Sequence, residues 1–236
     1  MNVFWQRLRR DVQMANMVKL AGLVLVLTAF AGGCGKSGER EVSDVSVTGV
    51  DQRKADLLNE IEAKYGNPDA HYELGKLYHA DGLLSRAEWE YNVALGFDPV
   101  HRKAQAALVK LLAESGNDDK SKLSAEIYMN QAGSTAQASL WLGQAFQKEL
   151  LDDYAVACYQ QALALAPNSA AINRQIGYYY LSKQDRVRAE EYLKRSFQID
   201  PYQDEVAREL GRMGVIVQVP RKIETDTKKL DQILGQ

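Results

Sequence analysis

The sequence is poor in the residues that build disulfide frameworks and metal sites. Its 236 residues include only two cysteines, Cys34 and Cys158, and three histidines. Two cysteines cannot provide the set of disulfides that stabilises a small secreted domain. His71, His79 and His101 do not have the spacing of zinc ligands, and Cys158 lies on an expected helix between apolar neighbours, which favours a buried, inert thiol. We therefore expect no metal and no disulfide framework.

No arrangement of catalytic residues stands out either. Gly35-Lys36-Ser37 resembles the end of a phosphate-binding loop, but Phe30 stands where such a loop needs glycine. Paired acids fall in expected turns or on solvated faces, at Asp118-Asp119, Asp152-Asp153 and Glu190-Glu191. The sequence thus predicts a protein that is not an enzyme and that has no cofactor and no small-molecule substrate.

The apolar run at residues 20–30 is too short to span a bilayer, which takes about 20 residues of helix. It follows Arg7, Arg9, Arg10 and Lys19 and precedes small residues, which is the order of charge, apolar run and cleavage site in a secretory signal. The residues before Cys34 resemble a bacterial lipobox, although Ala31 stands where that motif usually has Leu. The resemblance implies removal of residues 1–33 and acylation of Cys34. An ordinary cleaved signal remains the alternative, and Met14 or Met17 remain alternative starts.

By the usual lipoprotein sorting rule, Gly35 after the lipidated cysteine favours the periplasmic face of the bacterial outer membrane. Residues 1–33 carry more basic than acidic residues, so the mature chain is more acidic than the formal net charge of −2. An acidic balance argues against nucleic acid as a partner.

Prolines are also few, with five in the chain, and three of them share a phase with a glycine ladder of 34 residues. Gly75, Gly143, Gly177 and Gly211 occupy the rungs, each after an aliphatic residue, and Val109 replaces the missing rung. Other in-phase sets are Ala87, Ala155 and Ala189; Tyr91, Tyr159 and Leu193; and Pro99, Pro167 and Pro201. A fixed period of this length indicates stacked helical hairpins.

The pattern resembles the tetratricopeptide repeat (TPR), matched by HYELGKLY, SLWLGQAF and NRQIGYYY with their downstream partners. The resemblance implies an all-α fold, a right-handed α-solenoid of helix-turn-helix repeats over residues 68–213. The second repeat departs from the pattern at Ser121, Tyr128 and Gly133, and we expect it to stack with altered packing. Outside the array, the sequence predicts a tether at 34–50, a capping helix at 51–67 and an extension at 214–236. TDTKKLDQIL within that extension has the pattern of a short amphipathic helix, read either as a cap over the open end or as a partner-docking segment.

In TPR proteins the partner binds a concave face lined by the first helix of each repeat. On that geometry the residues expected to point into the groove are Tyr72, Lys76, His79, Lys103, Lys110, Gln144, Lys148, Arg174, Tyr178, Arg208 and Arg212, with Leu140 and Leu181. Bases outnumber the acids counted there, Asp69, Glu114 and Glu205. A basic groove with tyrosines favours an acidic or C-terminal peptide, although ordinary solvated lysines and arginines give the same pattern. The carboxylate clamp of chaperone-binding TPR proteins is not matched, because its Lys-Asn pair is absent.

The resemblance implies a scaffold lipoprotein that assembles an envelope complex through protein–protein contacts. Two narrower roles stay open: a pilotin for a type IV pilus secretin, and an adaptor for enzymes of peptidoglycan or polysaccharide export.

Overall fold

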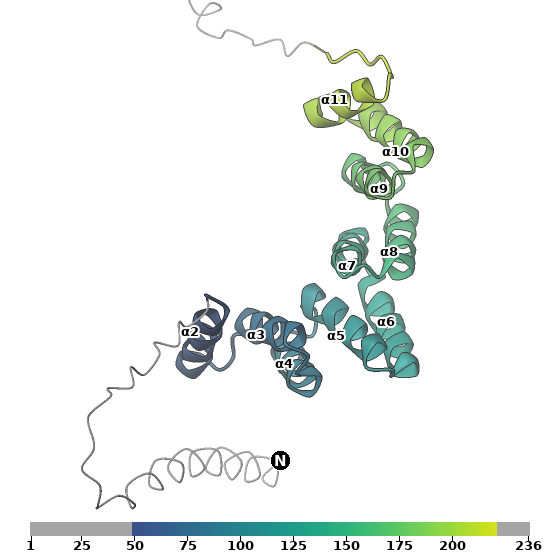
Figure 1. Ribbon diagram of the computed structural model, residues 1–236. Coiled ribbons are helices and arrows are strands. Elements are labelled where there is room, and N and C mark those ends of the chain that lie inside the picture. The colour runs from purple at the N-terminus through teal and green to yellow at the C-terminus, as the bar shows by residue number, and fades with distance from the viewer. Residues whose placement is uncertain (1–48, 221–236) are drawn as a thin grey trace, which may run out of the picture. The chain divides into compact units, whose positions relative to one another are not determined.

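The structure is a computed structural model that describes residues 49–220, within one compact unit of residues 47–236. The expected signal segment, Cys34, nearly all of the tether and most of the C-terminal extension lie outside the described residues. Ten helices and no strands make up the described range (Figure 1). The helices are α2 (Gly49–Ala63), α3 (Pro68–Ala80), α4 (Leu84–Phe97), α5 (Arg102–Glu114), α6 (Asp118–Ala132), α7 (Ala136–Lys148), α8 (Asp152–Leu165), α9 (Ala170–Ser182), α10 (Arg186–Ile199) and α11 (Asp204–Arg212).

Helices α3 to α10 form four hairpins, α3–α4, α5–α6, α7–α8 and α9–α10, and each hairpin packs on its neighbours in sequence. The all-α TPR solenoid predicted from the 34-residue period is confirmed. One such hairpin cannot bury its apolar face alone, so the array is stabilised by contacts between consecutive repeats. The largest buried cluster accordingly draws its residues from α5 through α10.

The glycine rungs are notches that receive a large side chain from the second helix of the same hairpin. A Cβ at Gly75 would lie 2.7 Å from the Tyr91 ring, and one at Gly143 would lie 2.7 Å from the Tyr159 ring. In the fourth hairpin the side chain of Leu193 takes this place against Gly177. The close approach of the two helices therefore depends on the missing side chain.

In the second repeat, the large and small residues of the two contacting helices are exchanged. Val109 occupies the glycine rung and Ala125 stands where the first and third hairpins have tyrosine, and both are fully buried in one cluster. Ser121, which is in phase with the alanines, is buried and donates its hydroxyl hydrogen bond to the Val109 carbonyl at 2.8 Å. In this repeat, therefore, the larger residue lies on the first helix and the smaller one on the second, which is the reverse of the first and third hairpins. This is the altered packing expected from the sequence.

The first helix of each repeat is capped by an in-phase polar residue. Asn67, Thr135 and Ser169 accept hydrogen bonds from the backbone N–H three residues later, at 3.4, 3.1 and 3.4 Å. His101 does the same through its Nδ1, at 3.1 Å from the Ala104 nitrogen. Each cap satisfies one of the N–H groups that a helix start leaves without a partner.

Each turn between the first and second helix of a repeat has one residue in the left-handed backbone region, and these residues are 34 positions apart. Gly82 and Gly116 have φ of 74° and 77°, and Leu150 and Gln184 keep the same conformation at 62° and 61°. Since only glycine adopts this region without a Cβ penalty, the third and fourth turns carry local strain.

Helix α2 packs on α3 through the buried Leu57, one period ahead of Tyr91. Lys54 of α2 also forms an ion pair with Asp81 after α3. The helix begins at Gly49, two residues before the predicted capping segment, and ends at Ala63.

Candidate functional site

The first helices of the repeats contribute to two cavities, each of about 330 Å³. We call the first the turn cavity, because the α4–α5 turn forms part of its wall. It is lined by Asp69, Asp98, Val100, His101, Arg102, Lys103, Trp141, Gln144, Ala145 and Lys148. We call the second the charged cavity, and it is lined by Lys76, His79, Ala80, Tyr91, Lys110, Glu114 and Glu149.

The basic side chains of the charged cavity already have acidic partners. The Nε2 of His79 lies 2.6 Å from Glu114, and the Nζ of Lys110 lies 3.2 Å from Glu149. Both pairs join residues of different repeats. Lys76 pairs with Glu73 one turn away, at 3.2 Å. Three acids therefore pair with these bases within the protein: Glu114, which the sequence count of the groove included, and Glu149 and Glu73, which it did not.

In the turn cavity, two of the predicted cations have no acidic partner. Lys103 at the start of α5 and Lys148 at the end of α7 form no ion pair within the described part of the chain, and both are exposed. The Trp141 side chain lines the same space and is 56% exposed. The cavity thus combines two available ammonium groups with an aromatic face.

The wall of this cavity is held in place by His101. Its Nδ1 accepts the α5 cap hydrogen bond, so the ring proton is on Nε2, which donates to Asp69 Oδ1 at 3.1 Å. Asp98 accepts from the Val100 N–H at 3.0 Å, which fixes the turn itself. Both acids of the cavity are therefore engaged with the turn.

The two predicted tyrosines differ from the expectation of open ligands. Tyr72 is only 6% exposed, and its ring lies against Tyr91 and His101. Burial raises the pKa of Tyr72 well above its ordinary value. Tyr178 is half-buried, and burial raises its pKa too, with Glu205 adding to the effect.

Of the other residues predicted to face the groove, one lines the turn cavity and the three arginines contact neighbouring residues of the protein. Gln144 is half-buried and lines the turn cavity, while Arg174 donates to the Gln203 side chain at 3.2 Å. Arg208 donates to the Asp204 carbonyl at 3.2 Å, and Arg212 pairs with Glu209 at 2.9 Å.

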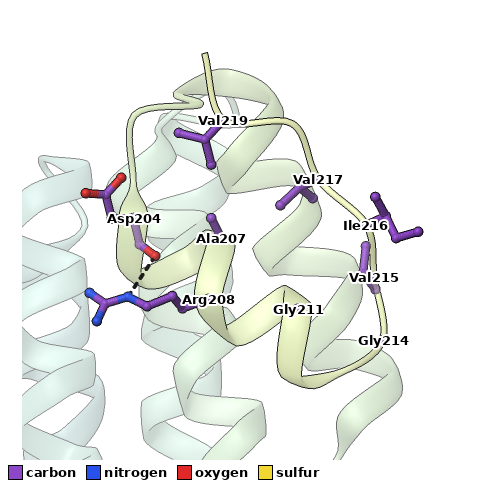
Figure 2. Close-up of a pocket in the computed structure, with 9 residues that line it drawn as sticks. All are labelled: Asp204, Ala207, Arg208, Gly211, Gly214, Val215, Ile216, Val217 and Val219. Carbon is purple, nitrogen blue, oxygen red and sulfur yellow. Dashed lines mark hydrogen bonds between the residues drawn. The ribbon is translucent and has the colours of Figure 1, made fainter. Parts of the chain in front are cut away.

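A third and larger space, of about 940 Å³, lies at the far end of the array (Figure 2). We call it the terminal groove. Helix α11 forms one side, and the extended segment 214–219 forms the other. Its lining residues are Asp204, Ala207, Arg208, Gly211, Gly214, Val215, Ile216, Val217 and Val219.

Sequence reasoning missed Trp141, the cap role of His101, and the two acids Glu73 and Glu149 that pair with groove lysines. Trp141 was detectable, because Trp141, Gln144 and Lys148 follow i, i+3, i+7 spacing and so share a helix face. The cap role of His101 was detectable as well, from its phase with Asn67 and Thr135.

His71 of α3 is fully buried. Both of its ring nitrogens form hydrogen bonds: Nδ1 lies 2.6 Å from Glu90 Oε2, and Nε2 lies 2.9 Å from the Tyr65 carbonyl oxygen. The Tyr65 carbonyl can only accept, so the Nε2 of His71 donates to it. The first hairpin thus contains a buried, hydrogen-bonded pair of polar side chains, His71 and Glu90.

Among the residues that the structure describes, no cluster of His, Cys, Asp and Glu has the form of a metal site. Within the same range, every helix is too short or too polar to cross a membrane.

The helical hairpins and the cavities along their first helices define a TPR-type α-solenoid. No family model matches the chain, and no curated protein matches it. Similar solved structures include a crystal structure of MamA, with 18% identity, a TM-score of 0.34 and coverage of 66% of this chain and 96% of that one. Others are YrrB, described as a TPR protein with an unusual peptide-binding site (18% identity, TM-score 0.37, 71% and 86% coverage), and the thermophilic TPR protein TTC0263 of Thermus thermophilus (18%, 0.38, 69% and 89%). At these identities and TM-scores the likeness assigns neither a partner nor an activity to this chain.

Proposed function

We propose that this protein is a non-enzymatic TPR scaffold, anchored to the bacterial envelope by lipid on Cys34, that binds an acidic segment of a partner protein in the turn cavity. The observation that supports the binding site is the pair Lys103 and Lys148, both without an acidic partner in the described part of the chain, beside the exposed Trp141 ring.

The two lysines come from different hairpins, so a peptide that contacts both must bridge the second and third repeats. Carboxylates accept strong charge-assisted hydrogen bonds from ammonium groups. The Trp141 face adds apolar contact area and can pack against an aliphatic or aromatic side chain of the peptide. Affinity from such contacts falls with salt, because the lysines are exposed and their charges are screened.

The test is a charge reversal, Lys103→Glu with Lys148→Glu, measured by titration with an acidic peptide and with its amide counterpart of the same length. Each charged hydrogen bond is worth about 1.5–3 kcal/mol, so binding of the acidic peptide should weaken by about tenfold or more. The matched control is Lys120→Glu with Lys122→Glu, which makes the same charge change on exposed positions of α6. Equal loss in both variants would reduce the effect to net charge and would remove the turn cavity as the site.

The anchor is tested separately at Cys34, which lies outside the described residues. We expect Cys34→Ser to move the protein to the soluble fraction and to abolish labelling by a fatty-acid probe. Unchanged fractionation of the variant would contradict the lipid anchor, and a cleaved soluble form of the chain that keeps Cys34 would support an ordinary signal.

Two narrower roles would fit the same scaffold. A pilotin role predicts that a deletion strain loses its pili, whereas an adaptor of peptidoglycan or polysaccharide export enzymes predicts intact pili and a change in the envelope polymer. Crosslinking through a photoreactive residue at position 141, in native envelopes, would identify the partner in either case.

A further inference from the structure

Arg102 is a third base of the turn cavity, and it forms no ion pair within the described part of the chain. Its guanidinium is half-buried and forms one hydrogen bond, from Nη1 to Gln105 Oε1 at 2.9 Å. Nε and Nη2 have no partner in the same range. They nevertheless reach solvent, because Asn173 Oδ1 is the only side-chain nitrogen or oxygen of the described residues that is buried without a hydrogen bond. The edge of the guanidinium that can donate two parallel hydrogen bonds to a carboxylate is therefore open.

Gln105 fixes the position of this guanidinium. The Gln105 side chain is fully buried, and its Nε2 donates to the Pro99 carbonyl at 2.7 Å and to Gln131 Oε1 at 2.9 Å. Both amide hydrogens are therefore used, and Oε1 remains to accept from Arg102. Because the guanidinium is oriented before a ligand arrives, binding requires less ordering of the side chain.

The first turn of α5 carries two bases, unlike that of every other first helix in the described array. Arg102 and Lys103 are in phase with Pro68-Asp69, Ala136-Gln137, Ala170-Ala171 and Asp204-Glu205. A cation at a helix N-terminus opposes the helix dipole, so both bases lower the stability of α5. Burial is a further cost, because it lowers the pKa of Arg102 below its ordinary value, although Asp98 counteracts this effect. An anion in the cavity would offset both costs, which favours a role in binding over a role in folding.

Two other residues of the turn cavity also depart from the period. Trp141 is in phase with Glu73, Ala107, Gln175 and Glu209, and Lys148 is in phase with Ala80, Glu114 and Ser182. The repeated packing of the hairpins therefore requires neither an aromatic ring nor a base at these positions. The cavity gathers these departures at the boundary between the second and third repeats.

We infer that Arg102 anchors the acidic partner segment by holding one of its side-chain carboxylates through Nε and Nη2, while Lys103 and Lys148 hold further acids of the same segment. This inference rests on the proposed function and specifies its ligand, a protein segment with at least two acidic side chains beside an aromatic or large aliphatic one. Charge complementarity supports it, because the two acids of the cavity, Asp69 and Asp98, are already engaged with the turn.

Arg102→Lys tests the anchor, because it keeps the charge of the cavity and removes the planar fork of the guanidinium. The parent is the full chain with Cys34→Ser, and the probe is the capped peptide Glu-Glu-Phe-Glu-Glu, titrated by calorimetry at fixed ionic strength. Loss of one charged hydrogen bond should weaken binding about tenfold or more. The matched control is Arg195→Lys, the same change at an exposed position of α10 outside the turn cavity, and it should bind as the parent does.

Single Glu→Gln changes along the peptide then locate the carboxylate that Arg102 holds. At one position the change should weaken binding to the parent strongly and binding to the Arg102→Lys variant much less, since the two changes remove the same contact. Circular dichroism verifies that the variant keeps the helix content of the parent. Equal effects of every peptide change on the two chains would overturn the anchor.

The controls distinguish failure of the anchor from failure of the proposed function. Equal peptide affinity of the parent and the Arg102→Lys variant would refute the anchor alone, provided that reversal of Lys103 and Lys148 still weakens binding. Equal weakening by Arg195→Lys would also refute it, because any arginine would then have the same effect. If Gln-Gln-Phe-Gln-Gln binds the parent as tightly as the glutamate peptide does, both the anchor and the acidic ligand are wrong.

Discussion

Gly143 illustrates how one missing side chain sets the distance between two helices. An alanine there would place its Cβ 2.7 Å from the Tyr159 ring and 3.1 Å from Cys158. Since Tyr159 is fully packed and cannot move aside, Gly143→Ala should lower the free energy of unfolding by about 1–3 kcal/mol. Denaturant unfolding followed by circular dichroism measures this change.

The matched control is Gly96→Ala on α4, where an added Cβ meets nothing within 4 Å. Alanine in an open helical position gains about 0.5–1 kcal/mol over glycine. The two substitutions should therefore shift the midpoint in opposite directions, and a loss of stability at both would contradict the notch argument.

Leu150 adopts a left-handed backbone conformation that favours glycine. It has φ of 62° in a turn where Gly82 and Gly116 occupy the equivalent positions, and its side chain is 73% exposed. Leu150→Gly removes a left-handed penalty of about 1–2 kcal/mol while losing little packing, offset in part by the greater freedom of glycine in the unfolded chain. We expect a net gain of about 0.5–1 kcal/mol in thermal or denaturant unfolding. The reverse change, Gly82→Leu, should destabilise, and no difference between the two variants would show that these turns are not strained.

Cys158 is fully buried, and burial raises the pKa of its thiol from 9.0 to about 12, against a small opposing effect of Arg102. At pH 8 the thiolate is scarce and inaccessible, so a thiol reagent should modify Cys158 only after unfolding. An exposed cysteine at position 85, Ser85→Cys in a chain with Cys34→Ser, provides the reference rate. Equal rates at the two positions would contradict the burial.

At the scale of the hairpin, the second repeat tests whether size exchange between two helices is a true compensation. Val109→Gly alone should leave a void beside Ala125, and Ala125→Tyr alone should collide with Val109. The double variant recreates the glycine–tyrosine pair of the first and third hairpins. We expect it to be more stable than the sum of the two single changes by about 1–2 kcal/mol in a double-mutant cycle. Additive losses would mean that the two positions do not contact each other as the buried cluster indicates.

The periodic elements are what the sequence made predictable. The spacing of Gly75, Gly143 and Gly177 indicates hairpins because a helix approach that excludes a Cβ must recur wherever the hairpin recurs. The degenerate second repeat also kept its place, since Val109 and Ala125 exchange the small and large positions and both stay fully buried.

The charge of the groove was not predictable in the same way. His79 pairs with Glu114 and Lys110 pairs with Glu149, in each case across a boundary between repeats. Such contacts depend on the rotation from one hairpin to the next and on rotamers, neither of which a 34-residue period specifies. Tyr72 likewise stands at an inward position by phase, yet its ring turns into the core beside Tyr91.

At the scale of the whole array, stability is a sum over neighbouring repeats, so a group buried at one boundary affects the hairpins on both sides. Two tyrosines are buried at the boundary between the third and fourth hairpins. Tyr159 of α8 and Tyr179 of α9 stack edge to face at 5.5 Å between ring centroids. Burial is the main cause that raises the pKa of each from 10.0 to about 12, and it raises the pKa of Tyr91 further still.

These raised pKa values predict how stability depends on pH. Above pH 10 the unfolded chain releases tyrosine protons that the folded chain still holds, so the unfolded state binds fewer protons and the free energy of unfolding falls as pH rises. The contribution is fully present below pH 10 and is lost progressively as the pH approaches 12.

Because each hairpin depends on its neighbours, opening at the α8–α9 boundary should spread along the array, and helix content should be lost in step with tyrosine ionisation. Parallel titrations by tyrosinate absorbance and by far-ultraviolet circular dichroism, both above pH 10, check this coupling. Tyr202→Phe removes an exposed tyrosine and should leave the midpoint of helix loss unchanged. Tyr159→Phe removes a buried tyrosine and should move the midpoint of helix loss to higher pH. The comparison is with a variant that keeps Tyr159 and has the same free energy of unfolding at pH 7. Complete ionisation while the helix signal stays constant would show that the tyrosines are accessible in the folded array, contrary to the packing at this boundary.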